Sequence, residues 1–91
     1  MATVTMRYWA AAKAAAGVAE QRLTADTLAA ALAQAADTAH AAKKEGADRL
    51  RAVLARSSFL IDGDPVGLRA ADSIVLREGN VIEVLPPFAG G

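Results

Sequence analysis

The end of the chain carries the residues best suited to chemistry. The last six, which follow the apolar run 81–85 directly, are Pro86, Pro87, Phe88, Ala89, Gly90 and Gly91. A terminal carboxylate is ionised at neutral pH and is therefore a poor electrophile. A mixed anhydride with AMP would give it a good leaving group, so that sulfur or an amine could attack the carbonyl carbon. The simpler alternative is a frayed terminus that happens to end in two glycines.

The composition of this tail favours insertion into another protein. Proline fixes φ near about −65° and favours extended geometry in the residue before it, so Pro86 and Pro87 predict a stiff extension. Gly90 and Gly91 have no Cβ atom, which lets a partner's backbone close around them. Six extended residues reach at most roughly 20 Å. We therefore expect a domain over residues 1–85 and an extended tail over 86–91.

Both ends of the sequence resemble a known family. The stretch 77–91, which ends Val-Ile-Glu-Val-Leu-Pro-Pro-Phe-Ala-Gly-Gly, resembles the C-terminus of the ubiquitin-like sulfur carriers. Among these it is most similar to the small subunit of molybdopterin synthase. Residues 4–10, with Gly17 seven positions further on, are similar to that family's first strand and short helix. The alanine-rich middle of the chain matches in pattern only.

The resemblance implies a chemical role for Gly91 and for two partners. A ubiquitin-activating-like adenylating enzyme would use ATP to convert the Gly91 carboxylate to an acyl-adenylate. A persulfide sulfur would then displace AMP and leave a thiocarboxylate. The large subunit of molybdopterin synthase would receive the tail and pass the sulfur to a pyranopterin precursor. The chain itself would be a co-substrate that binds no cofactor, and not an enzyme, since it has no evident acid–base pair or activated nucleophile.

Composition excludes several other classes. The ten basic and ten acidic residues cancel, so we expect neither nucleic acid nor a membrane as partner. The chain has no cysteine, which excludes disulfides and a thiolate nucleophile. We expect no metal site, because His40 is the only histidine and Asp62 and Asp64 suit a turn better than a cation. Without a signal peptide or a long apolar run, a cytoplasmic protein is expected.

Hydrophobic patterns predict the order of elements. Alternation over 3–9 predicts a strand with Val4, Met6 and Tyr8 on its core face and Trp9 on the other. We further expect a helix over 10–16, an antiparallel edge strand over 19–23, and a long helix from Leu28 that Gly46 ends. After these we expect a short helix over 49–55, a strand over 58–61 followed by an Asp-Gly turn, a possible short strand over 66–68 and a last strand over 81–85.

This order, with the resemblance, predicts an α+β fold of the β-grasp (ubiquitin-like) class, with a mixed sheet of four to five strands over one main helix. The first and last strands would lie side by side and parallel, with Ile82 and Val84 facing the helix. Trp9, Leu85 and Phe88 would then form an exposed apolar patch at the root of the tail, beside Arg7. Such a patch usually marks a partner surface, and we take Trp9, Leu85 and Arg7 as partner-binding.

Two alternatives for function stay open. The same sulfur chemistry could serve thiazole or cysteine biosynthesis or tRNA thiolation, although thiazole carriers tend to lack the pair Pro86-Pro87. Alternatively, the chain is a ubiquitin-like modifier, joined through Gly91 to a lysine of its target, or a plain binding module. A binding module would tolerate loss of both glycines, and a carrier or modifier would not.

Overall fold

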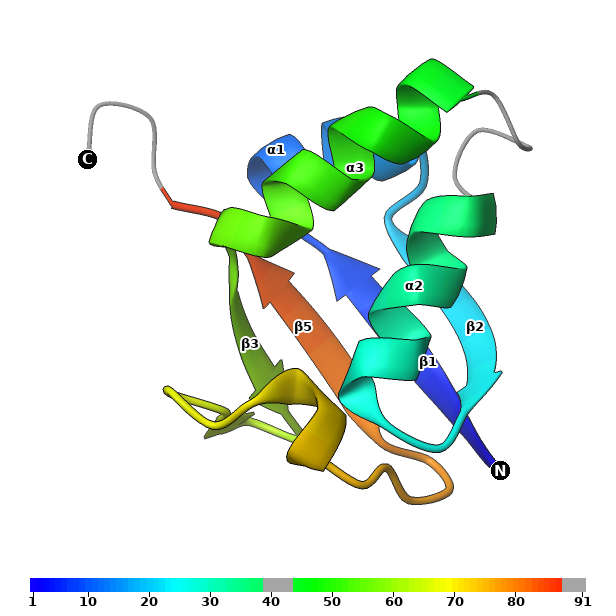
Figure 1. Ribbon diagram of the computed structural model, residues 1–91, viewed down its shortest axis with the longest axis vertical. Coiled ribbons are helices and arrows are strands. Elements are labelled where there is room, and N and C mark those ends of the chain that lie inside the picture. The colour runs from blue at the N-terminus through cyan, green and yellow to red at the C-terminus, as the bar shows by residue number, and fades with distance from the viewer. Residues whose placement is uncertain (39–43, 88–91) are drawn as a thin grey trace.

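Five strands form one mixed sheet in the order β2-β1-β5-β3-β4 (Figure 1), in a computed structural model that describes residues 1–38 and 44–87. In chain order the elements are β1 (Ala2–Tyr8), α1 (Ala10–Ala16), β2 (Glu20–Ala25), α2 (Leu28–Thr38), α3 (Lys44–Arg56), β3 (Ser58–Ile61), β4 (Asp64–Pro65), the 3₁₀ helix η2 (Ala71–Ser73) and β5 (Val81–Leu85).

The first and last strands occupy the middle of this sheet. β1 runs parallel to β5 and antiparallel to β2, while β3 runs antiparallel to both β5 and β4. Figure 1 shows α2 and α3 in front of the sheet, with α1 next to α3. This is the β-grasp arrangement, so the predicted fold class and the parallel pairing of the terminal strands are confirmed.

Strict alternation along the central strands separates the core from the outer face. Val4, Met6 and Tyr8 are buried, whereas the residues between them are half-buried. Ile82 and Val84 are fully buried on β5, as predicted. A strand directs successive side chains to opposite faces, so the outer face belongs to the residues between these, Arg7 and Glu83 among them.

The helices cover the inner face, and alanine lets the first of them lie close to its neighbours. α1 spans the predicted residues 10–16 and buries Ala12, Ala15 and Ala16. Gly17 ends it in the left-handed conformation, with φ of 81°, and its N–H donates to the carbonyl oxygen of Lys13 at 2.9 Å. Such a C-terminal stop is open to glycine at no steric cost.

The prediction of one long helix that ends at Gly46 is wrong. α2 ends at Thr38, and a separate helix, α3, begins at Lys44 and is the longer of the two, at 13 residues against 11. Gly46 lies in the first turn of α3, where backbone N–H groups have no partner within the helix and glycine is tolerated. The predicted helix over 49–55 is the later part of α3. His40 and Lys43 lie outside the described residues.

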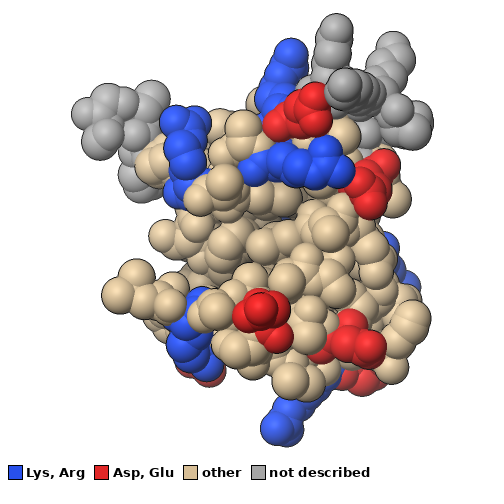
Figure 2. Space-filling view, in the orientation of Figure 1, with Lys and Arg blue, Asp and Glu red and all other residues tan. Residues whose placement is uncertain are grey.

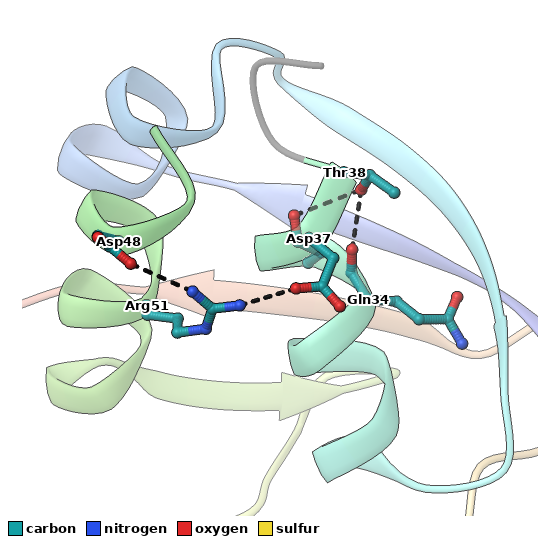
Figure 3. A network of polar contacts seen from close by, with 6 residues as sticks. Gln34, Asp37, Thr38, Asp48 and Arg51 are labelled. Atoms are coloured by element: carbon teal, nitrogen blue, oxygen red, sulfur yellow. Dashed lines mark hydrogen bonds and ion pairs between the residues drawn. The ribbon is translucent and has the colours of Figure 1, made fainter. Parts of the chain in front are cut away.

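One arginine joins the two helices at the surface. The Nη2 atom of Arg51 on α3 lies 2.7 Å from the Oδ1 atom of Asp37 on α2, and its Nη1 atom donates to Asp48 at 3.3 Å (Figure 3). All three side chains are more than half exposed, so each pair contributes about 0.2–1 kcal/mol at most. Burial of apolar side chains, with Leu28 and Leu50 fully enclosed, holds the helices to the sheet.

The predicted Asp-Gly turn joins β3 to β4. Asp62 and Gly63 have φ of 50° and 87°, the pair of positive values that a two-residue hairpin needs. The carboxylate of Asp62 also accepts hydrogen bonds from the backbone N–H of Val81 at 2.8 Å and from Nδ2 of Asn80 at 2.6 Å. The possible strand over 66–68 is absent: β4 stops at Pro65, and a turn containing Gly67 (φ 64°) follows.

None of the described helices combines the length and the apolarity that crossing a membrane requires.

Candidate functional site

The root of the tail lies beside the end of β1. The backbone N–H of Trp9 donates to the carbonyl oxygen of Val84 at 3.3 Å, directly after the register pair of Tyr8 with Val84. Trp9 therefore leaves the sheet next to Leu85, the last residue of β5. Pro86 and Pro87 follow at once, the first half-buried and the second exposed.

Trp9 itself is held at the surface by the start of α1. Its side chain is 45% exposed, so it is not covered by a neighbouring segment. The backbone of Trp9 is extended, and its carbonyl oxygen accepts the N–H of Ala12 at 3.0 Å as the helix begins. The next residue, Ala10, has a positive φ of 49°, which is uncommon for a residue with a Cβ atom and carries strain. The chain thus turns sharply at the point where it presents an aromatic ring.

Arg7 is the residue that the structure brings onto this ring. Its guanidinium carbon lies 5.6 Å from the centroid of the Trp9 ring, within cation–π range. Its Nε atom lies 3.5 Å from a carboxylate oxygen of Glu20 on β2, and Glu83 is its register partner on β5. Arg7 is therefore a guanidinium between two acidic neighbours, with one face on an aromatic ring. Sequence reasoning missed Glu20, whose place opposite Arg7 follows only from the register of the β1–β2 hairpin.

Tyr8 lies between Arg7 and Trp9 in the sequence, and its side chain points to the inner, buried face of the sheet. Its hydroxyl donates to Oε1 of Gln21 at 2.9 Å, and Nε2 of Gln21 donates to Oγ1 of Thr38 at 2.5 Å. Burial raises the pKa of Tyr8 to about 12. The phenol therefore stays neutral at physiological pH, and its hydrogen bond joins β1, β2 and the end of α2. Its role is structural.

This burial predicts a pH-dependent stability. Tyr8 has a higher pKa in the folded chain (about 12) than its ordinary value of 10.0, so the unfolded chain loses this proton first as pH rises. The contribution of Tyr8 is fully present below pH 10 and is lost as pH rises toward 12. At pH 8 we expect Tyr8→Phe to lower the free energy of unfolding by about 1 kcal/mol, the worth of one hydrogen bond.

Urea denaturation of both proteins from about pH 8 to 12 measures this effect. The difference between wild type and Tyr8→Phe should shrink across the upper part of that range, while the titration of other groups acts on both proteins alike. A difference that stays constant with pH would contradict the assignment of the high pKa to Tyr8.

The structure tests only part of the predicted site. Trp9, Arg7, Leu85, Pro86 and Pro87 are described, with Leu85 half-buried on the outer face of β5. The residues that lie outside the described part of the chain are Phe88, Ala89, Gly90 and Gly91, so the apolar patch with Phe88 and the roles of the glycines stay predictions.

A hollow of about 380 Å³ lies between β3 and the loop that follows β4, and it offers no chemistry. Its lining is mainly apolar and backbone. Its one charged residue, Arg69, donates to the carbonyl oxygens of Val66 at 2.9 Å and Pro65 at 3.1 Å. Over residues 1–38 and 44–87, no three His, Cys, Asp or Glu side chains lie together as metal ligands would.

Charged side chains of both signs are mixed on the face that carries the helices. Figure 2 shows them above and below a central region without charge. A nucleic-acid or anionic-membrane surface would need one sign to dominate a face, and this face lacks that feature.

Comparison with solved structures supports the fold. Small archaeal modifier protein 1 from Methanosarcina acetivorans is similar with a TM-score of 0.79 and 22% identity, over 100% of this chain and 98% of that one. A putative molybdopterin converting factor subunit 1 from Pyrococcus furiosus is similar with a TM-score of 0.71 and 17% identity, over 97% of this chain and 100% of that one. A complex of subunits 1 and 2 of molybdopterin-converting factor from Helicobacter pylori is similar with a TM-score of 0.62 and 23% identity, over 98% of this chain and 99% of the matched one. At these identities the likeness concerns the fold alone.

A family model gives the assignment that the structures do not. No curated protein matches the chain significantly. The model of the ThiS family, in contrast, matches residues 6–91, which is nearly the whole sequence and includes the end of β1, Trp9 and the tail. The chain belongs to the ThiS family of ubiquitin-like sulfur carriers, small proteins that are not catalytic themselves and bind no cofactor.

Proposed function

We propose that this chain carries sulfur on its last residue for the synthesis of molybdopterin. The observation that carries the proposal is the position of the tail root: β5, in the middle of the sheet, ends beside the half-exposed Trp9, and Pro86-Pro87 lead away from it toward Gly90-Gly91. Membership of the ThiS family supports the sulfur chemistry.

The reaction takes place at the carboxyl carbon of Gly91. An adenylating enzyme uses ATP to form the Gly91 acyl-adenylate and releases pyrophosphate. In the second step the terminal sulfur of a persulfide donor attacks the carbonyl carbon and the bond to AMP breaks, which joins Gly91 to the donor through an acyl disulfide. A thiol then attacks the donor's sulfur in that S–S bond, so that the donor leaves as a disulfide with the thiol and a thiocarboxylate forms on Gly91. Both catalytic steps belong to the partners, since no acid–base pair is placed at the root of the tail among the described residues.

The folded domain, residues 1–85, serves as the handle that the partners bind. Trp9 offers an aromatic surface, Leu85 adds apolar area next to it, and Arg7 supplies a charge that Glu20 already balances. A guanidinium held by a carboxylate and an indole ring loses little conformational entropy when a partner covers it. We propose this surface as the docking site for both the adenylating enzyme and the large synthase subunit.

Two features favour molybdopterin over other acceptors. Pro86-Pro87 is the pair that thiazole carriers tend to lack. The similar structures include a putative molybdopterin converting factor subunit and a complex of the two subunits of such a factor. A ubiquitin-like modifier is the second candidate, because a small archaeal modifier protein is similar over the full length with a TM-score of 0.79.

Intact mass spectrometry separates the two candidates. The chain is incubated with ATP, a persulfide donor, a thiol reductant and an adenylating enzyme of the molybdopterin branch. We expect a gain of about 16 Da, from replacement of one oxygen by sulfur. Conjugates of much higher mass would support the modifier instead. Sulfur transfer from the charged chain to a pyranopterin precursor, with the large synthase subunit present, then tests the acceptor, and no transfer would contradict the molybdopterin assignment.

A further inference from the structure

The strand β2 forms an open edge of the sheet. The N–H of Tyr8 donates to the carbonyl oxygen of Ala19 at 2.8 Å, and antiparallel pairs alternate between bonded and non-bonded positions. Gln21 and Leu23, which are register partners of Met6 and Val4, therefore direct their backbone groups to β1. It follows that Glu20 and Arg22 direct their N–H and C=O groups away from the sheet.

Little of the described molecule covers this edge. Figure 1 shows β2 (cyan) at the margin of the sheet, and α2, which packs on β2, lies inward from that margin. Nε2 of Gln34 on α2 donates to the carbonyl oxygen of Thr24 at 2.6 Å and so occupies one edge group. Glu20, Arg22 and Thr24 are all exposed on the strand. Unpaired edge groups of this kind readily pair with another strand.

We propose that a second copy of this chain pairs with β2, antiparallel and centred on Gln21. This register sets Glu20 opposite Arg22 of the second copy, and Arg22 opposite Glu20 of the second copy. All four residues present outward-facing backbone groups, so each pair exchanges both of its hydrogen bonds. The two sheets then become one continuous sheet, and the Thr24 carbonyl that Gln34 occupies is not needed.

Charge selects this register. Directly opposite residues share a face, where opposite charges stabilise the pair and like charges destabilise it. These charges form a row on the outer face, across β5, β1, β2 and β2 of the second copy. The row consists of Glu83, Arg7, Glu20 and Arg22 of the second copy, and its charges alternate in sign.

Neighbouring registers with the same bonding pattern are worse. A register centred on Arg22 sets two arginines opposite one another. One centred on Leu23 sets Glu20 opposite Asp26. Charged residues on an edge strand usually prevent it from pairing with another strand. This protection fails where one register sets opposite charges against each other. Here two opposite charges lie two residues apart, which makes the edge complementary to itself.

Sedimentation equilibrium of the whole chain, without ATP or partners, tests the proposal up to about 1 mM. We expect a dimer that forms with increasing concentration. Glu20→Arg and Arg22→Glu should each weaken the dimer about tenfold or more, because each turns two attractive pairs into repulsive ones. The double variant Glu20→Arg, Arg22→Glu should restore the dimer to within about threefold of wild type.

Arg49→Glu is the matched control, because it changes the net charge as Arg22→Glu does but lies on the exposed surface of α3. It should leave the dimer unchanged. Hydrogen exchange at high concentration should slow at the amides of Glu20 and Arg22 and not at Gln21, which is already bonded to β1. A chain that stays monomeric throughout, or a dimer that the charge reversals do not affect, would overturn the proposal.

Discussion

Removal of Gly91 is expected to abolish the gain of sulfur mass while the domain stays folded. The shortened chain still ends in a glycine carboxylate, so its chemistry is the same. Its reacting carbon, however, lies one residue, or about 3.4 Å, short of the adenylate-forming position. A misplacement of about 1 Å can cost about 100-fold in rate, so this shift should leave no measurable adenylation.

An added glycine after Gly91 provides the opposite test. It moves the carboxylate by one residue in the other direction and should also prevent the mass gain. Leu68→Ala is the control for general damage, since Leu68 is 106% exposed and lies in the loop after β4, and it should be charged like wild type. A full mass gain on the chain that ends at Gly90 would show that the adenylating enzyme does not depend on the position of the carboxylate, and would contradict the role proposed for Gly91.

The central strands could be predicted because their side chains alternate between the apolar core and the outer face of the sheet. The inner residues of β1 and β5 are buried and the outer ones are not, so the alternation of Val4, Met6 and Tyr8 was decisive. The turn at Asp62-Gly63 was predicted from the residue pair itself, because Asp and Gly accept the positive φ that such a turn needs, and both residues adopt it. Local chemistry and burial agree in these segments, and prediction succeeded there.

The boundary between α2 and α3 shows where such reasoning stops. Residues 28–56 are rich in alanine, which favours a helix at every position and marks no end. Gly46 has the same propensity whether it ends one helix or lies in the first turn of the next. Packing decides between these, because α2 packs on β2 while α3 packs on α1 and α2. The ion pair of Arg51 with Asp37 joins two helices whose boundary the sequence placed wrongly at Gly46, whereas the pair of Arg51 with Asp48 lies within α3.

The candidate site was likewise predictable from the sequence only in part. Trp9 and Leu85 could be placed together because parallel pairing of the first and last strands follows from the fold class. The contact of Arg7 with Glu20 required the hairpin register, which an edge strand of mixed residues such as β2 does not specify by hydrophobic pattern. The strained φ of Ala10 had no signal in a run of alanines.

Trp9→Ala is expected to weaken binding to the adenylating enzyme and to the large synthase subunit by about 30-fold or more, the loss typical of an aromatic hot spot. Leu85→Ala should act in the same direction by a smaller factor, because Leu85 is already half-buried in the free protein. Isothermal titration calorimetry with each purified partner measures both effects. Arg7→Lys separates charge from stacking: lysine keeps the charge, but it does not lie flat on an indole ring as a guanidinium does.

The surface controls for these variants are Leu68→Ala and Val75→Ala, which remove apolar side chains that are 106% and 74% exposed elsewhere on the molecule. If any loss of exposed apolar area weakened binding, these would act as strongly as Trp9→Ala. We expect them to leave the affinity unchanged. Since nearly half of Trp9 is exposed, its loss should cost the fold little, and thermal unfolding checks this point. Unchanged affinity of a folded Trp9→Ala chain for both partners would mean that they bind another face, and that the ring beside the tail is not the docking surface.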